Sequence, residues 1–258
     1  MMTLFDVHMI LAILGIACIG GLIGLDRTAA GQFMISEPIV SGPLTGWILG
    51  DIGAGIVIGT VLELIWVLDI PIGTFVPADS TFSAICATAI AALGSTGAAG
   101  PSTIGFCILL TTVMVPCTMM ADTIVRKRNA RLADVPCASL ILVYAGITRA
   151  HLKGLFFFFL KSFILFLILV PAGILAVQGL HQLPGFIQRG MAFFVTMLPL
   201  LGMAIIASKL STTVLDGFLL MGFSVAVVAG TLLQAPLILV FLLVLAVGWL
   251  LVRYRDQA

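Results

Sequence analysis

Residues 42–66 have the sequence GPLTGWILGDIGAGIVIGTVLELIW, which is apolar apart from Asp51, Glu63 and two threonines. Most of its glycines recur at a spacing of four in two ladders, Gly42, Gly46 and Gly50 followed by Gly55 and Gly59. A spacing of four places small residues on one face of a helix, and such faces let helix backbones approach closely in a lipid bilayer. The stretch therefore predicts closely packed helices with a break at Gly50-Asp51.

The apolar character of this stretch extends over the whole chain. Of the 258 residues, 61% are hydrophobic and 9% are charged, and the mean hydropathy is +1.27, well above that of a soluble domain. At about 20 residues for each transmembrane helix, this composition supplies at most about eight spans and leaves no room for a sizeable soluble domain. Strands of a membrane barrel alternate polar and apolar residues, whereas 163–177 is apolar throughout. We predict an all-α, polytopic membrane protein that forms a single domain over residues 1–258.

Two kinds of apolar segment predict the organisation of the chain. Six are long enough to cross a bilayer or nearly so: 7–25, 104–121, 155–177, 191–207, 214–233 and 236–252. Three are shorter and are separated by Gly, Pro and Asp: 39–49, 52–68 and 82–93. Runs this short predict broken or re-entrant helices, which persist at membrane depth only when buried in protein or lining a wet cavity. We therefore expect a broken-helix substrate region over 26–103 and a four-helix C-terminal half over 155–252.

The basic residues predict the orientation. Seven of the twelve bases lie between residues 126 and 161: Arg126, Lys127, Arg128, Arg131, Arg149, Lys153 and Lys161. Short loops rich in Lys and Arg remain in the cytoplasm, so we predict a cytoplasmic basic segment over 126–153 with an interfacial helix at 135–147. Counting spans from there places the C-terminus in the cytoplasm. The overall balance of 12 bases and 11 acids argues against a nucleic-acid partner.

The acidic residues predict the substrate path. Six of the eleven acids lie between residues 26 and 79: Asp26, Glu37, Asp51, Glu63, Asp69 and Asp79. A carboxylate at the bilayer centre costs about 2.5 kcal/mol or more, so such residues usually face a cavity. Asp26 and Glu37 lie near the ends of predicted spans, where solvation is a sufficient explanation. The segment that begins at Asp79 also has the pattern of a helix N-cap.

No base lies near Glu63 in its apolar run to neutralise the carboxylate. Three roles would explain an acid in this position. It is a protonated acid bound by neighbouring helices, a carrier of protons or ions, or an acceptor for the hydroxyl groups of a polar neutral substrate. Trp66 favours the third role, since carboxylates accept hydrogen bonds from sugar hydroxyls while an indole stacks on the apolar face of a sugar ring. Asp69 and Asp79 stand on either side of a proline-rich break, where unwound backbone supplies further donors and acceptors.

The sequence contains no signature of catalysis or metal binding. The five cysteines are isolated, without a C-x-x-C pair. Motifs of zinc proteases, serine hydrolases and P-loop proteins are absent. We expect no cofactor, no metal and no catalytic residue, and a permease rather than an enzyme.

One set of motifs resembles a known family. Pro38, Leu49-Gly-Asp51, Gly59-Thr60-x-x-Glu63, Ile72-Gly73 and Val76-Pro-Ala-Asp79 resemble the membrane IIC component of the mannose/fructose/sorbose family of the bacterial phosphotransferase system (PTS). The resemblance implies a multi-pass protein of the bacterial cytoplasmic (inner) membrane that binds and moves a sugar without being phosphorylated. It implies a IID membrane subunit and cytoplasmic IIA and IIB proteins as partners, and a homo-oligomer of IIC–IID pairs. It also implies sugar contact by Glu63 and Asp79, and less directly by Asp51, Trp66 and Asp69.

Three functional hypotheses follow from the sequence. The first is a sugar-translocating IIC subunit that delivers a hexose-type sugar inward for phosphorylation by IIB. The second is a proton- or cation-coupled secondary transporter that uses the same acids as ion carriers. The third is a membrane scaffold subunit without transport of its own.

Overall fold

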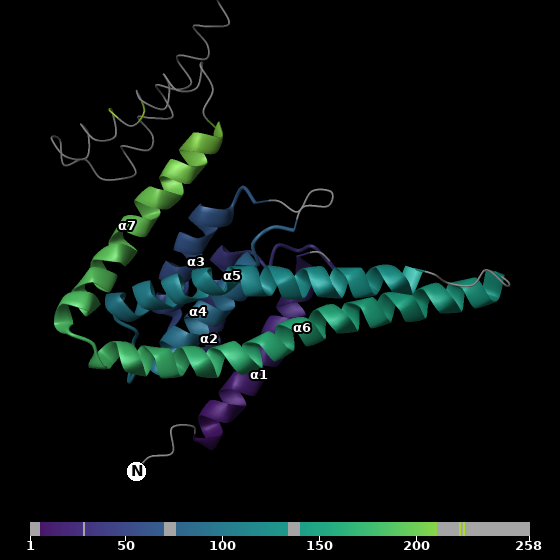
Figure 1. Ribbon diagram of the computed structural model, residues 1–258, viewed down its shortest axis with the longest axis horizontal. Coiled ribbons are helices and arrows are strands. Elements are labelled where there is room, and N and C mark those ends of the chain that lie inside the picture. The colour runs from purple at the N-terminus through teal and green to yellow at the C-terminus, as the bar shows by residue number, and fades with distance from the viewer. Residues whose placement is uncertain are drawn as a thin grey trace, which may run out of the picture. The chain divides into compact units, whose positions relative to one another are not determined.

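The computed structural model describes residues 6–27, 29–69, 76–133 and 140–210, together with residues 222 and 224. Within these ranges the regular structure consists of helices, and no strand is present: α1 (Val7–Asp26), α2 (Pro38–Leu49), α3 (Ile52–Trp66), α4 (Ser80–Gly94), α5 (Pro101–Ala130), the short 3₁₀ helix η1 (Arg131–Ala133), α6 (Leu140–Gln182) and α7 (Gly185–Leu210) (Figure 1). The predicted all-α class is confirmed. The predicted segments 214–233 and 236–252 and the Ile72-Gly73 motif lie outside the described residues, positions 222 and 224 apart.

Four described helices are long and apolar enough to cross a membrane: Val7–Asp26, Pro101–Ala130, Gly146–Gln182 and Gly185–Lys209. They coincide with the first four of the six predicted spans. The protein is therefore a multi-pass helical membrane protein. The chain forms two compact units, Met1–Met203 and Ala204–Ala258, and every contact described below lies within the first. The single domain expected over 1–258 stays a prediction.

Helix α6 corrects one expectation. The separate interfacial helix predicted at 135–147 is wrong from residue 140 onward, because residues 140–182 form one continuous helix of 43 residues. No proline interrupts the join with the predicted span, since the only proline in α6 is Pro171, and isolated glycines do not end a helix. At 1.5 Å per residue the helix is about 65 Å long, which exceeds the thickness of a bilayer of about 40–45 Å.

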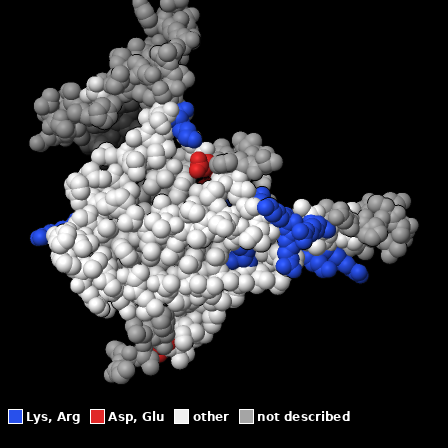
Figure 2. Space-filling model, viewed as in Figure 1, with Lys and Arg blue, Asp and Glu red and all other residues white. Residues whose placement is uncertain are grey.

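The last part of α5 and the first part of α6 run side by side (Figure 1). The side-chain amide of Asn129 donates a hydrogen bond of 3.2 Å to the carbonyl of Gly154 between them. Figure 2 shows Lys and Arg side chains gathered over this part of the molecule, while most of the visible surface of the helices is uncharged. The bases of the predicted 126–153 segment thus cluster beyond the apolar part of both helices.

Helices α2 and α3 form a hairpin whose turn is the predicted break at Gly50-Asp51. Gly50 ends α2 in the left-handed conformation with φ of 84°, and the Asp51 side chain accepts a hydrogen bond of 3.0 Å from the backbone N–H of Ala54 at the start of α3. A Cβ atom built on Gly42 would lie 2.7 Å from the carbonyl oxygen of Gly55, and one built on Gly55 would lie 2.5 Å from that of Gly42. The two backbones are therefore in contact, and the predicted close packing is confirmed.

Helix α4 lies in the interior of the first unit. It packs against α1, α2, α3, α5 and α6, and every residue from Ser80 to Ala91 is buried. The ring of Phe82 stacks on that of Phe166 in α6 with a centroid distance of 4.7 Å. With 15 residues α4 is too short to span a bilayer. Neighbouring helices bury it instead, as membrane depth requires of a broken helix.

Candidate functional site

An open cavity of about 1380 Å³, its mouth included, lies beside the first turn of α2 and the last turn of α3. Its lining residues are Asp26, Arg27, Gln32, Met34, Ser36, Glu37, Ile39, Val40, Glu63, Trp66, Val67 and Asp69. Four of them are acids and one is a base. Three of the five predicted substrate-binding residues, Glu63, Trp66 and Asp69, line this one cavity.

Glu63 is held at the N-terminus of a neighbouring helix. Its Oε2 atom accepts a hydrogen bond of 3.2 Å from the backbone N–H of Ile39, in the first turn of α2. The first N–H groups of a helix lack partners within the helix and carry partial positive charge, so they stabilise a carboxylate. Within the part of the chain that the structure describes, Oε1 has no hydrogen-bond partner. This oxygen is free to accept a hydrogen bond from a substrate hydroxyl.

Trp66 and Asp69 complete one side of the cavity. Trp66 is the last residue of α3, one helical turn from Glu63, so both side chains lie on one face. Beyond the helix, the backbone N–H of Asp69 donates a hydrogen bond of 2.9 Å to the carbonyl of Trp66. Both residues line the same cavity.

The opposite side of the cavity is a loop that the sequence did not identify. Asp26, expected to be solvated, is 7% exposed. It accepts hydrogen bonds from the backbone N–H groups of Phe33 at 2.6 Å and Ser36 at 3.2 Å. Gln32 and Met34 have left-handed backbones with φ of 56° and 63°, which is uncommon outside glycine. The buried carboxylate thus stabilises a strained loop at the cavity wall, and no spacing in the sequence signals this pairing.

The two remaining predicted residues stand elsewhere, at helix N-termini. Asp51 caps α3 through Ala54, and its Oδ2 atom accepts a hydrogen bond of 2.7 Å from the backbone N–H of Ala99. Asp79 caps α4 by accepting a hydrogen bond of 3.0 Å from the backbone N–H of Phe82, so the predicted N-cap is confirmed. Neither residue lines the large cavity. Their contact with a sugar stays a prediction.

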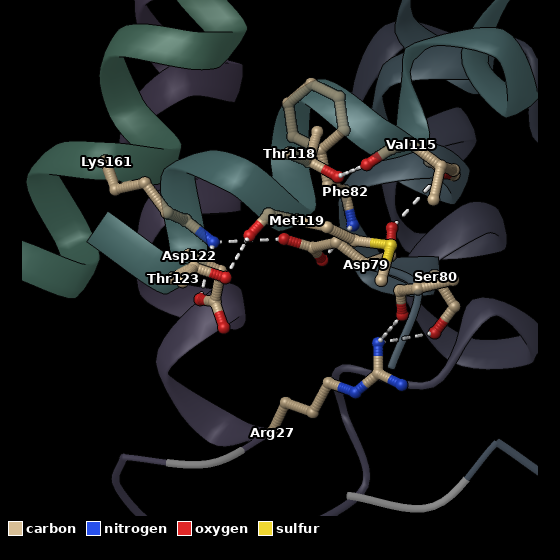
Figure 3. Close-up of polar contacts among 12 residues, drawn as sticks. Arg27, Asp79, Ser80, Phe82, Val115, Thr118, Met119, Asp122, Thr123 and Lys161 are labelled. Carbon is tan, nitrogen blue, oxygen red and sulfur yellow. Dashed lines mark hydrogen bonds and ion pairs between the residues drawn. The ribbon is translucent and has the colours of Figure 1, made fainter. Parts of the chain in front are cut away.

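Asp79 belongs to a buried cluster of ion pairs (Figure 3). The ammonium group of Lys161 in α6 lies 3.1 Å from Oδ2 of Asp79 and 3.3 Å from Oδ1 of Asp122 in α5. Arg126 lies 2.6 Å from the other oxygen of Asp122. The Lys161 side chain is 8% exposed, so it is separate from the surface bases with which the sequence groups it. Its partners lie 82 and 39 residues away in sequence, which is why charge counting alone misses the cluster.

Arg27 lies between this cluster and the large cavity. One guanidinium nitrogen, Nη1, donates hydrogen bonds to the carbonyl of Ala78 at 2.7 Å and to the hydroxyl of Ser80 at 2.9 Å (Figure 3). The other, Nη2, donates to the carbonyl of Asp69 at 3.4 Å. Arg27 lines both the large cavity and a much smaller one beside the ion pairs. Arg27 therefore stands in the wall shared by the large cavity and the ion-pair cluster.

Comparison with known proteins gives one family, a curated relative and several solved structures. The family model EII-Sor, described as the PTS system sorbose-specific IIC component, matches residues 7–249. A protein of Escherichia coli (strain K12) described as N-acetylgalactosamine permease IIC component 2 is 38% identical over 68 residues, which are 26% of this chain and 50% of that protein. The chain thus spans about half the length of this curated relative.

Two solved structures share the fold. One, described only as a membrane protein, has a TM-score of 0.71 and 22% identity, and covers 98% of this chain and 97% of its own. The other is the cryo-EM structure of the mannose transporter ManYZ in complex with microcin E492, with a TM-score of 0.53, 21% identity, and coverage of 98% and 96%. Identities this low show the fold alone. The family model, however, covers almost the whole sequence, and we conclude that the chain belongs to the EII-Sor family of PTS IIC components.

Proposed function

We propose that this protein is the sugar-translocating membrane subunit of a mannose-family, phosphoenolpyruvate-dependent phosphotransferase system. It binds a hexose-type sugar and moves it inward for phosphorylation by a partner IIB protein. The observation that carries the proposal is the acid-rich cavity in which Glu63, Trp66 and Asp69 converge. Membership of the EII-Sor family supports it.

The chemistry of the cavity suits a neutral, hydroxyl-rich ring. Oε1 of Glu63 and the carboxylate of Asp69 accept hydrogen bonds from sugar hydroxyls, and bonds to charged groups are stronger than those between neutral groups. The Trp66 indole offers an apolar face to the ring. The backbone contact of Glu63 with Ile39 holds the acceptor in position before the sugar arrives. We assign Asp51 and Asp79 a supporting role at the starts of α3 and α4.

The ion-pair cluster argues against the alternative in which these acids carry a coupling ion. An acid that carries an ion must release its counter-charge during transport, whereas Lys161 is a covalently attached cation shared by Asp79 and Asp122. Asp51 is likewise occupied by two backbone N–H groups. Among the predicted site residues, we assign the cavity-lining acids Glu63 and Asp69 to the substrate. Sugar hydroxyls suit them because an ionised carboxylate accepts hydrogen bonds and donates none.

Partners and placement follow from the same proposal. We assign phosphotransfer to cytoplasmic IIA and IIB proteins and none of it to this chain, and we expect a IID membrane subunit and an oligomer of IIC–IID pairs. The protein lies in the bacterial cytoplasmic (inner) membrane with its basic 126–153 segment and its C-terminus in the cytoplasm. Motion of the broken-helix region relative to the remaining helices would expose the cavity to each side in turn.

Uptake by cells that contain the complete system tests the proposal. Labelled mannose, fructose, sorbose and N-acetylgalactosamine are supplied separately, with phosphoenolpyruvate production intact or with a protonophore added. We expect one or more of these sugars to accumulate as the sugar phosphate despite the protonophore. Glu63→Ala should abolish uptake while the protein still reaches the membrane, and Asp6→Asn, at an exposed acid outside the cavity, should not. Uptake that collapses with the protonophore, or that survives Glu63→Ala, would overturn the proposal.

A further inference from the structure

Lys161 is a charged residue that is buried within an apolar helix. It lies in the apolar span Gly146–Gln182, and its side chain is 8% exposed. Ionisable groups inside membrane helices are costly to insert, and they usually mark functional sites. Lys161 does not line the large cavity. Lys161 lines the smaller cavity beside the ion pairs instead, so any effect of Lys161 on the large cavity must pass through the residues that it contacts.

Those contacts join three helices at one point. Asp79 precedes α4, Asp122 lies in α5, and Lys161 lies in α6, and the ammonium group is within 3.3 Å of a carboxylate oxygen from each of the other two. The second oxygen of Asp79 caps α4, and the second oxygen of Asp122 pairs with Arg126. Each carboxylate oxygen in the cluster thus has a partner. An ion cluster this fully satisfied holds its members in one arrangement.

The arrangement continues to the wall of the cavity. Ser80 follows Asp79 directly, and its hydroxyl accepts from Arg27 at 2.9 Å. The same guanidinium donates to the carbonyl of Ala78 on one side and to that of Asp69 on the other. Residues 69 and 78 are therefore tied to one side chain, although the proline-rich break separates them in sequence. We therefore expect a shift of the start of α4 to move Arg27 and, through the carbonyl that it contacts, the backbone at Asp69.

We propose that Lys161 is a positioning residue of the sugar cavity, which fixes the start of α4 against α5 and α6 and thereby, through Ser80 and Arg27, fixes the place of Asp69. The inference rests on the proposed function, because it concerns the affinity of the same cavity. It goes beyond that function in assigning part of the affinity to a residue that touches no substrate.

A double-mutant cycle between Lys161 and Asp69 tests the inference. The dissociation constant is measured on the purified IIC–IID pair in nanodiscs, with whichever of mannose, fructose, sorbose or N-acetylgalactosamine the unmodified pair binds. Lys161→Met should weaken binding by about tenfold, the size of effect seen when a coupling network is broken. In an Asp69→Asn background, Lys161→Met should weaken binding little further, because the carboxylate that Lys161→Met displaces has already been replaced. Lys161→Arg, which keeps the charge, should restore most of the affinity.

Two controls and one alternative variant separate positioning from a general loss of structure. Lys153→Met removes an exposed base from the same helix and should leave the affinity unchanged. A second cycle, Lys161→Met with Trp66→Phe, should be additive, since the hydrogen bond that joins Trp66 to Asp69 uses the Trp66 backbone carbonyl, which phenylalanine keeps. If Lys161→Met does not fold, the cycle is run with Lys161→Met/Asp79→Asn, in which Asp122 and Arg126 still pair and no buried charge is left alone.

The outcomes are distinct. Strict additivity between Lys161 and Asp69 in a protein that binds sugar would overturn this inference and leave the proposed function standing. Failure of the unmodified protein to bind any of the four sugars would overturn the proposed function and this inference with it. Coupling between Lys161 and Asp69, together with rescue by Lys161→Arg, would establish the positioning role.

Discussion

A single methyl group added at Gly55 tests the contact between α2 and α3. The Cβ atom of Gly55→Ala would lie 2.5 Å from the carbonyl oxygen of Gly42, 3.0 Å from its carbon and 3.1 Å from Cα of Pro43. All three atoms belong to backbone, so rotation of a side chain cannot relieve the overlap. Ordinary contact begins at 3.4 Å, so the two helices must separate by roughly 0.9 Å. Overpacking of this kind costs about 1–3 kcal/mol.

Gly53 provides the matched control in the same helix. A Cβ atom there would meet only Oδ1 of Asp51, at 3.7 Å, which is ordinary contact. Alanine is favoured over glycine inside a helix by about 0.5–1 kcal/mol, so Gly53→Ala should be neutral or stabilising. The same gain partly offsets the overlap at Gly55. The net cost expected there is about 1–2 kcal/mol.

Thermal unfolding of both variants in the same detergent measures the difference. With about 2–4 °C for each kcal/mol in a protein of this size, Gly55→Ala should unfold several degrees below Gly53→Ala. Separation of the helices should also stretch the contact between Ile39 and Glu63, now 3.2 Å, and weaken sugar binding. Equal unfolding temperatures and equal sugar affinities for the two variants would refute the argument that backbone contact at Gly55 holds the cavity together.

Three further predictions follow from the cavity and its supports. Trp66→Ala should weaken sugar binding by about tenfold through loss of stacking, whereas Trp47→Ala, at a tryptophan that is 69% exposed, should not; equal losses in a binding assay would contradict the stacking role. Asp26→Ala leaves two backbone N–H groups unpaired and should lower stability by about 2–4 kcal/mol, measured by thermal unfolding against Asp26→Asn, which keeps an acceptor. Asp79→Ala should unfold at a lower temperature than Asp79→Asn, because asparagine still caps α4 and the lost cap costs about 1 kcal/mol; the reverse order would argue against capping.

The helix boundaries of the N-terminal third could be predicted because their causes are local. Gly50 ends α2 in a conformation that suits glycine, and Asp51 and Asp79 cap the helices that directly follow them. Pro38 stands in the first turn of α2, where its missing N–H has no consequence. The boundary expected between the segments 135–147 and 155–177, which α6 crosses as one helix, lacks any such signal. There the sequence contains bases that suggest an interface and nothing that ends a helix.

The cavity could be predicted only in part. Glu63 and Trp66 are three residues apart in one helix, so their common face follows from helix geometry. Asp69 follows within one turn of the chain. Asp26 and Arg27 reach the cavity from the end of α1, and nothing in their spacing from α3 indicates that they do so. The strained loop at Gln32 depends on the same long-range arrangement.

The composition of the sequence by itself determined that the protein lies in a membrane. The sequence also determined where the helices of the N-terminal third form and where they are interrupted, because glycine spacing and capping act over a few residues. Only the tertiary structure decided which acids face the cavity and which are neutralised. Glu63 and Asp69 line the large cavity, whereas Asp79 and Asp122 share the ammonium group of a residue 82 and 39 positions away. The reason is physical: the cost of a buried carboxylate depends on the charges within a few ångströms of it, and helix packing, not sequence order, sets those distances.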